Sequence, residues 1–461
     1  MRGVLGSERG GLGRPFLFGT HGLGRPFLFG TRGLGRPLFW ICASIASMLM
    51  ASPGETAPPP APGTLRIATY NVSLYRRESG ALAQELTTGR STQAATIAAV
   101  LQEVRPDLLL INEFDYDGAV DDDHAKRPPA PAALAFLRGY LGVSQGGREP
   151  IACPTLFSAP SNTGLPSGVD LDRDGRIGGG NDARGFGLFP GQYGMLVCSH
   201  LTLRRDQVRS FRNFLWRDMP GADLPPDWYG PDALAVLPLS SKSHWDLPFE
   251  LPMAPGAAPC APPRVLHLLA SHPTPPGFDG PEDRNGRRNH DEIRLWADYL
   301  SPDRDGHLVD DAGQRGGLAA EASFVIAGDL NADPVDGGSR NGAIRQLLEH
   351  PRVHREAAVG RWVPRSAGAA EAARRQGGAN DRQRGPANED TADFSDGGTN
   401  SPGNMRVDYV LPSADLAVCA SGVYWPTQDD PAFAWVNDDA ATSSDHRLVW
   451  VDIALPGARC P

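Results

Sequence analysis

The chain has 461 residues, of which 40% are hydrophobic, so it is long and apolar enough to bury a substantial core in one large two-sheet domain. It carries 44 basic and 54 acidic residues, a formal net charge of −10. An acidic chain does not attract polyanions over long distances, which argues against a high-affinity DNA binder without excluding one, because bound divalent cations change the local field.

Residues 1–52 are predicted to lie outside the folded domain. Residues 11–40 repeat an eleven-residue unit punctuated by Gly and Pro, too short and irregular for a solenoid. A basic residue, the apolar run 38–50 and a small-residue exit then follow, as in a secretory signal peptide. The run is short for a membrane span, so we expect a secreted or periplasmic bacterial protein with no stable span after export. Residues 53–63, rich in Pro and Ala, are interpreted as a linker.

Six apolar runs that end in polar residues come next and are predicted to be strands. The runs and their polar residues are 65–71 with Asn71, 107–113 with Glu113, 264–273 with His272, 324–334 with Asp329 and Asn331, 406–413 with Asp408, and 444–451 with Asp445 and His446. Because strand side chains alternate, Asp329 and Asn331 are predicted to point the same way. Hard oxygen ligands and imidazoles at strand ends indicate a metal-assisted hydrolytic site.

Helices are predicted between the strands. Residues 91–104 and 289–300 carry apolar side chains at helical spacing, and 343–348 is a short helical stretch. Strands that alternate with helices favour an α/β protein. Two long segments, 115–262 and 364–404, exceed what a compact core needs. We interpret both as insertions that shape substrate choice, and the second as a long surface loop near the site entrance.

In this order, the motifs TYN, INE, SHP, GDLNADP, RVDY and SDH resemble the endonuclease/exonuclease/phosphatase superfamily, which includes pancreatic-type deoxyribonucleases, neutral sphingomyelinases and inositol polyphosphate phosphatases. The resemblance covers residues 64–456. It implies an α/β fold: a four-layer α/β/β/α sandwich of two mostly antiparallel sheets with helices outside and the site at one end.

The resemblance also implies a metal centre. Glu113 would be the principal carboxylate ligand, Asn71 its neighbour, and Asp445 would complete the shell. Such oxygen donors suit Mg²⁺, or Mn²⁺ in its place.

The resemblance assigns roles to five further residues. Asp329 would orient or deprotonate the attacking water, and Asn331 would donate to a phosphoryl oxygen. His446 would stabilise the phosphorane or act as acid or base, with Asp408 on its other ring nitrogen. His272 would contact the scissile phosphate or protonate the leaving oxygen. The motif does not decide between Asp329 and His446 as the base.

A segment in the first insertion has acidic residues at calcium-loop spacing. Asp170, Asp172 and Asp174 precede Gly175 at positions 1, 3 and 5, but the twelfth position is Asn181. The segment is a structural Ca²⁺ site or an acidic Gly-rich turn. In the same insertion, Lys242 and His244 either bind a distal substrate phosphate or belong to a surface loop.

Five cysteines follow the signal segment: Cys153, Cys198, Cys260, Cys419 and Cys460. No pair has CxxC spacing, which argues against a zinc site. Export would permit two disulfides and leave one cysteine unpaired. A disulfide between Cys419 and Cys460 could hold the C-terminal strand in place. The alternative is that they are small buried hydrophobic residues.

The leading hypothesis is an exported, monomeric, metal-dependent phosphoesterase acting on a phosphate mono- or diester. The first alternative is a secreted nuclease, for which nucleic acid is the partner and an arginine–aromatic segment over 204–216 the candidate binding patch. The second is a non-catalytic binding module of the same fold. A protein that had become such a module should have lost some of its metal-binding and catalytic residues, whereas the motif residues named above are all present.

Overall fold

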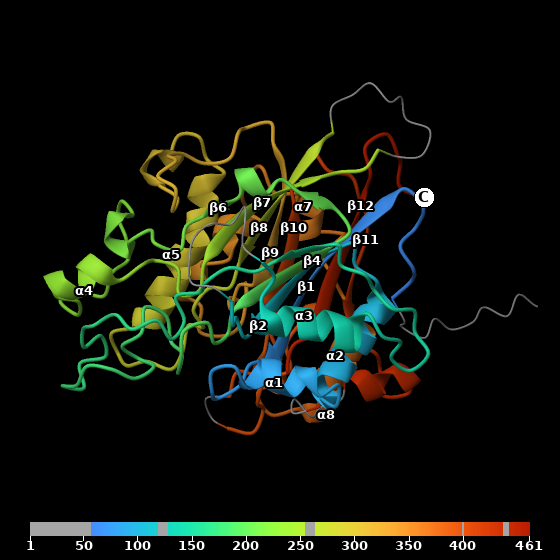
Figure 1. Cartoon of the computed structure of the whole chain (residues 1–461), viewed down its shortest axis with the longest axis horizontal. Coiled ribbons are helices and arrows are strands. Elements are labelled where there is room, and N and C mark those ends of the chain that lie inside the picture. Colours follow the sequence, from blue (N-terminus) through green and yellow to red (C-terminus); the bar gives the residue numbers. More distant parts are fainter. Residues whose placement is uncertain (1–56, 119–127, 254–262, 399–400, 437–441) are drawn as a thin grey trace, which may run out of the picture. The chain divides into compact units, whose positions relative to one another are not determined.

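Two six-stranded sheets pack against each other in this chain (Figure 1), in a computed structural model that describes residues 57–118, 128–253, 263–398, 401–436 and 442–461. The predicted repeat and export signal, the start of the linker and Cys260 lie outside the described residues. The first sheet has the strand order β11-β12-β1-β2-β4-β3. Its strands are β1 (Thr64–Leu74), β2 (Leu108–Phe114), β3 (Thr155–Phe157), β4 (Met195–Ser199), β11 (Val418–Tyr424) and β12 (Leu448–Ala454).

The second sheet has the order β10-β9-β8-β7-β5, with β6 also paired to β7. Its strands are β5 (Thr202–Leu203), β6 (Arg209–Ser210), β7 (His244–Glu250), β8 (Val265–Ser271), β9 (Ser323–Asp329) and β10 (Asp408–Pro412). In each sheet one neighbouring pair is parallel, β1 with β2 and β8 with β9, and the other pairs are antiparallel. The prediction of two mostly antiparallel sheets is confirmed.

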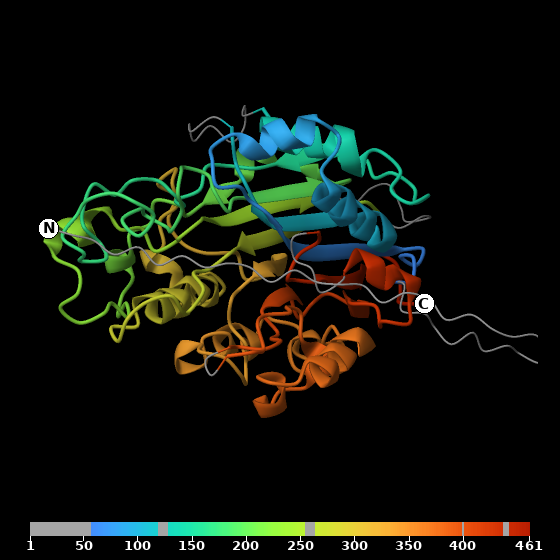
Figure 2. The same ribbon diagram turned by 90° about the horizontal axis from the view of Figure 1, so that it is seen from below.

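Helices cover the outer faces of the sheets, as the view from below in Figure 2 shows. The helices are α1 (Ala81–Thr87), α2 (Thr92–Val104), α3 (Pro131–Phe136), α4 (Pro231–Val236), α5 (Arg284–Tyr299), α6 (Arg345–Leu348), α7 (Arg355–Ala358) and α8 (Ala367–Gln376). Apolar residues of α1, α2 and α3 join the core of the first sheet, and those of α5 and α6 join the core on the second. The predicted α/β four-layer arrangement is therefore present.

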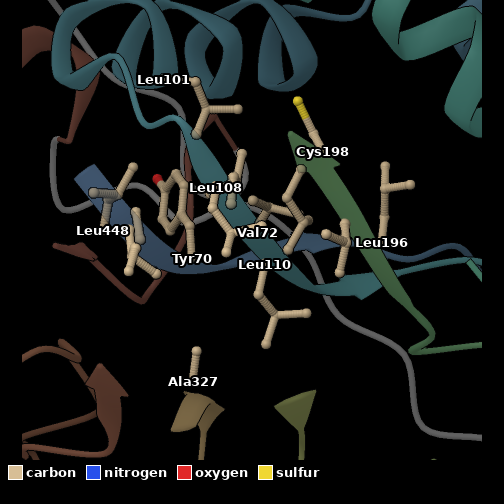
Figure 3. Close-up of a cluster of buried hydrophobic side chains, with 14 of the residues drawn as sticks. Tyr70, Val72, Leu101, Leu108, Leu110, Leu196, Cys198, Ala327 and Leu448 are labelled. Carbon is tan, nitrogen blue, oxygen red and sulfur yellow. The ribbon is translucent and has the colours of Figure 1, made fainter. Parts of the chain in front are cut away.

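The alternation of side chains along each strand builds these layers. In β9, Val325 and Ala327 belong to the core between the sheets, while Phe324 and Ile326 belong to the core under α5. In Figure 3 Leu110 of β2 points toward Ala327 across the space between the sheets. A strand that is buried on both faces has a continuous run of apolar residues, which is why β9 could be predicted from the sequence.

Local signals place the helix ends. Ser91 caps α2 by accepting a hydrogen bond from the Ala94 N–H, and Arg105, in the left-handed conformation at φ 54°, ends it before Pro106. The predicted helix at 91–104 is thus confirmed. The helix predicted over 289–300 begins five residues earlier, at Arg284. No helix in the described ranges is both long and apolar enough to cross a membrane.

Two disulfides join distant segments. Cys153 pairs with Cys198 of β4, and Cys419 of β11 pairs with Cys460 near the C-terminus. The second pairing is the one that the sequence suggested.

The segment 364–404 is not a single surface loop. It contains α8, capped by Ser366, and then a stretch in which Thr391 and Ala392 are buried. Ala392 makes isolated β-bridges with both Met405 and His446. The prediction missed this because the buried side chains here are small: Ala369, Ala372 and Ala373 of α8 pack into the core without a strong apolar pattern.

Candidate active site

Polar residues at or next to the ends of six strands lie together at one end of the two sheets. Asn71 and Glu113 lie near the C-terminal ends of the parallel strands β1 and β2, and His272 directly follows β8. Asp329 is the last residue of β9 and pairs in register with Asp408, the first residue of the antiparallel β10. The topology therefore brings together side chains that are hundreds of residues apart in the sequence.

Asp329 is the centre of the site. Its Oδ2 accepts a hydrogen bond from Asn71 Nδ2 at 3.0 Å and lies 3.3 Å from His272 Nε2 and 3.7 Å from His446 Nε2. Burial alone would raise the pKa of Asp329, but the two histidines and the hydrogen bonds lower it below its ordinary value. Asp329 is therefore a buried carboxylate held in its ionised form.

His446 faces Asp329 on one side and Asp408 on the other. Its Nδ1 lies 2.9 Å from Asp408 Oδ2. Burial opposes a charge on the ring, yet the carboxylates of Asp408 and Asp329 outweigh it and raise the pKa of His446 well above its ordinary value. The arrangement presents an imidazolium whose Nε2 side is turned to the centre of the site.

The segment after α8 closes around this pair. Thr391 Oγ1 donates to Asp408 Oδ2 at 2.8 Å, and the Phe394 ring meets the His446 ring edge-on, with centroids 5.3 Å apart. The Asp393 N–H donates to the Asp445 carbonyl at 2.7 Å. The second insertion thus supplies part of the wall around the histidine.

Glu113, His272 and Asp329 each place one ligand atom within 4.8 Å of the others, a spacing that suits a shared metal ion. Burial, more than any other cause, raises the pKa of Glu113 to about 7, so a cation beside this carboxylate would be needed to ionise it fully at neutral pH. Asp329, Asp408 and His446 form a second such group, but the Nδ1 of His446 is engaged with Asp408. The first group, with its two carboxylates, fits a divalent ion better. Asn71 turns its Nδ2 toward Asp329, while its Oδ1 accepts from the Ser73 N–H at 3.2 Å.

Asp445 lies beside this group and belongs to neither cluster among the described residues. Its Oδ1 accepts a hydrogen bond from Ser73 Oγ at 2.9 Å, and its charge acts on Glu113. Metal binding by Asp445 stays a prediction.

The Pro273 carbonyl receives two donors from the site. Asn331 Nδ2 lies 3.0 Å from it and Lys242 Nζ 3.4 Å. The amide of Asn331 has a second N–H that this bond leaves available for a substrate oxygen. However, Asn331 does not follow strand alternation, because β9 ends at Asp329 and Asn331 has a left-handed φ of 52°.

Lys242 is buried within the site and does not lie on a surface loop. Burial lowers the pKa of Lys242, and this effect outweighs the nearby carboxylates of Glu292, Glu113 and Asp329, whose charges raise it. Burial and then Lys242 lower the pKa of His272 to about 4, so His272 is neutral. Lys242 is therefore placed to meet an anion bound next to Glu113.

His244 does not face a substrate. Its Nδ1 bonds Ser240 Oγ at 2.6 Å, its Nε2 bonds the Glu292 carbonyl at 2.9 Å, and burial lowers its pKa to about 4. Both ring nitrogens are satisfied, so the ring anchors the start of β7. The sequence could not distinguish this histidine from a ligand.

Helix α5 carries a buried polar face that positions the site loops. Glu292 accepts from the Ser241 N–H at 2.6 Å, from Ser241 Oγ at 2.8 Å and from the Thr274 N–H at 2.6 Å. Asn289 Nδ2 donates to the carbonyls of Thr274 and Leu330. The loops with Lys242, His272 and Asn331 are thus fixed to one helix. Asn289 and Glu292 were not predicted as site residues, although two polar residues three apart on a helix face with Ile293 and Trp296 are the available signal.

Three residues of the site have left-handed backbones although they are not glycine. Ser73, Glu113 and Asn331 have φ values of 49°, 56° and 52°. Such conformations cost free energy and persist where the surrounding structure enforces them, commonly at functional sites.

Other predicted features lie apart from this centre. Asp170, Asp172 and Asp174 do bring one oxygen each within 4.8 Å of the others, and calcium binding there stays a prediction. The arginine–aromatic segment is not an exposed patch. Its aromatic residues Phe211, Phe214 and Trp216 are buried in the core under α5, where their apolar area stabilises the fold.

Comparison with known proteins agrees with this geometry. The family model described as "Endonuclease/Exonuclease/phosphatase family" matches residues 68–446. The chain belongs to this family. Its members act on phosphoester bonds and are typically dependent on divalent metals. No curated protein matches the sequence.

Solved structures of this family resemble the chain at low identity. An endonuclease/exonuclease/phosphatase from Beutenbergia cavernae is 17% identical, with a TM-score of 0.43, over 86% of this chain and 72% of its own. A family protein from Leptotrichia buccalis is 13% identical, with a TM-score of 0.41, over 84% and 99%. A mannosyl-6-phosphatase from Bacteroides thetaiotaomicron is 11% identical, with a TM-score of 0.36, over 84% and 99%.

Proposed function

We propose that this protein is an exported, divalent-metal-dependent phosphoesterase that hydrolyses a phosphate mono- or diester with an activated water. The observation that carries the proposal is the position of Asp329, an ionised buried carboxylate within 4 Å of both His272 and His446. A water held by Asp329 would lie between a metal group on one side and an imidazolium on the other.

Each residue has a chemical task in this proposal. We assign the ion, Mg²⁺ or Mn²⁺, to Glu113, His272 and Asp329, with Asn71 next to Glu113. Its charge would neutralise the charge of the phosphate. Asp329 would orient the water and accept its proton. His446, charged through Asp408, would stabilise the negative charge that develops on the phosphoryl oxygens. It would give its Nε2 proton to the leaving ester oxygen as the bond from phosphorus to that oxygen breaks. Lys242 and the second N–H of Asn331 would bind a phosphoryl oxygen from the side of Pro273.

Export is supported by two features. A basic residue followed by the apolar run 38–50 resembles a signal peptide, and two disulfides suit an oxidising compartment. N-terminal sequencing of the protein recovered from the periplasm or medium would test this, with a new N-terminus expected near residue 53.

Hydrolysis of bis-p-nitrophenyl phosphate with Mg²⁺, Mn²⁺ or EDTA tests the activity. We expect metal-dependent release of p-nitrophenol that EDTA abolishes. Glu113→Gln should lower kcat/KM by at least two orders of magnitude, while Glu349→Gln, which alters an exposed carboxylate, should leave it unchanged. Unchanged turnover in Glu113→Gln would refute the metal role.

A further inference from the structure

Three aromatic rings form a shelf next to Glu113: Tyr75, Tyr193 and Phe186. The rings of Tyr75 and Tyr193 have centroids 4.5 Å apart and planes tilted by 48°, and Phe186 continues the row 6.4 Å from Tyr193. Tyr75 is 37% exposed and Phe186 is 56% exposed. Tyr193 between them is partly buried. Aromatic rings that gather with two of them exposed indicate a binding surface.

The shelf lies at the edge of the candidate active site. Tyr75 directly follows β1, which carries Asn71, and Gly194, next to Tyr193, accepts a hydrogen bond from the Phe114 N–H through its carbonyl at 3.0 Å. Burial first, and then the charge of Glu113, raises the pKa of Tyr75. Burial, Tyr75 and Glu113 together raise the pKa of Tyr193 to about 12. Both rings are therefore close to the carboxylate expected to hold the metal.

The shelf is held in place by Asp115, two residues after Glu113. Asp115 Oδ2 accepts from the Arg76 N–H at 2.8 Å, and its Oδ1 accepts from the Tyr193 N–H at 3.1 Å. Gln192 Nε2 also donates to the Arg76 carbonyl at 2.6 Å. Tyr193 has a left-handed φ of 55°, a costly conformation for a tyrosine that these bonds maintain. The two tyrosines are thus fixed relative to each other before any ligand binds.

We propose that this shelf stacks a nucleobase carried by the substrate, so that the preferred substrate of the proposed phosphoesterase is a nucleotide ester. The inference rests on the proposed function for its link to catalysis. Flat rings stack on aromatic side chains with about 1 to 3 kcal/mol per base, and they do so without base specificity. Arg77 is exposed and its charge acts on both tyrosines, so a cation lies beside the shelf for a neighbouring phosphate.

The charge of the chain limits the size of the nucleotide substrate. The protein has a net charge of −10, which repels a long polyanion, whereas one or a few nucleotides are bound by local contacts. The source of the base is either a free nucleotide ester or a short single strand, and both present the same ring to the shelf.

The test compares two esters with the same leaving group, thymidine 5′-(p-nitrophenyl) phosphate and methyl p-nitrophenyl phosphate, using the full-length protein. Tyr193→Leu, Tyr75→Leu and Phe186→Ala should each raise KM for the thymidine ester about tenfold, with kcat little changed, because stacking binds ground and transition states alike. KM for the methyl ester should stay constant. Tyr193→Phe and Tyr75→Phe keep the rings and should behave as the parent. Equal effects on both esters, or no effect on either, would overturn the proposal.

Binding can be measured without turnover, which separates this inference from the proposed function. Equilibrium dialysis with radiolabelled thymidine 5′-monophosphate should show binding to the parent and to Tyr193→Phe, and at least fivefold weaker binding to Tyr193→Leu. Failure to hydrolyse either ester with metal would refute the phosphoesterase alone, whereas equal nucleotide binding by all variants would refute the shelf alone. Competition by an oligothymidylate of eight nucleotides identifies the source of the base. Stronger inhibition than by the mononucleotide indicates a short single strand, and weaker inhibition indicates a free nucleotide ester. Should Tyr193→Leu not fold, Phe186→Ala, at an exposed position, gives the same comparison.

Discussion

Thr391 Oγ1 donates to Asp408 Oδ2 at 2.8 Å, the same oxygen that faces Nδ1 of His446 at 2.9 Å. The Thr391 hydroxyl oxygen also accepts from the N–H groups of Val407 and Asp408, both at 3.0 Å. A single side chain from the second insertion therefore fixes both the strand start and the carboxylate that orients the histidine. Thr391 is a positioning residue, because it acts on the site through Asp408.

Replacing Thr391 by Val should weaken this arrangement while preserving its shape. The change removes one donor and one acceptor among buried groups, which should cost about 1 to 3 kcal/mol of unfolding free energy. We expect kcat to fall about tenfold with KM nearly constant, and the pH profile of kcat to shift, since Asp408 loses a bond to its charged form. Thr391→Ser should restore the profile. A drop in stability with an unaltered pH profile would show a structural role only.

Replacing Glu292 by Gln should separate the site loops from α5. The buried carboxylate accepts three hydrogen bonds from Ser241 and Thr274, and an amide cannot accept all of them. We expect a loss of about 2 to 4 kcal/mol in urea unfolding, together with a lower kcat/KM, because Lys242 and His272 lie on the released loops. Glu349→Gln, exposed on the surface, is the matched control. Normal stability in Glu292→Gln would contradict the assigned bonds.

The disulfide between Cys419 and Cys460 should stabilise the chain mainly by limiting its unfolded state. It closes a loop of 41 residues, for which chain entropy predicts ~4 kcal/mol. Replacing both cysteines by Ser should therefore lower the unfolding free energy by up to that amount without changing KM. Titration of free thiols before and after reduction checks the pairing, and an unchanged midpoint under oxidising conditions would contradict it.

The sequence reveals the residues that end long apolar runs and hides those placed by tertiary contacts. Glu113 and Asp329 could be predicted because a buried strand leads directly to each. Thr391 and Tyr193 could not, because nothing near them in the sequence records that one contacts Asp408 and the other packs against Tyr75. The same limit explains Phe211 and Trp216: arginines next to aromatics look alike in an exposed binding patch and in a core, and only packing decides.

Asp390, next to Thr391 in the second insertion, should make stability depend on pH. It is buried, its Oδ2 has no hydrogen-bond partner among the described residues, and Asp333, Asp336 and Glu389 face it. Burial, followed by these three carboxylates, raises its pKa to about 8. Folded Asp390 thus stays protonated between about pH 4 and pH 8, where the unfolded chain releases the proton, so its contribution to stability falls as the pH rises through this range.

Asp390→Asn cannot ionise, so its stability relative to the parent should increase from pH 4 to pH 8 and then level off. Thermal unfolding at pH 4, 6, 8 and 9 measures this difference, and a constant difference across the series would show that Asp390 is ionised in the folded protein at neutral pH.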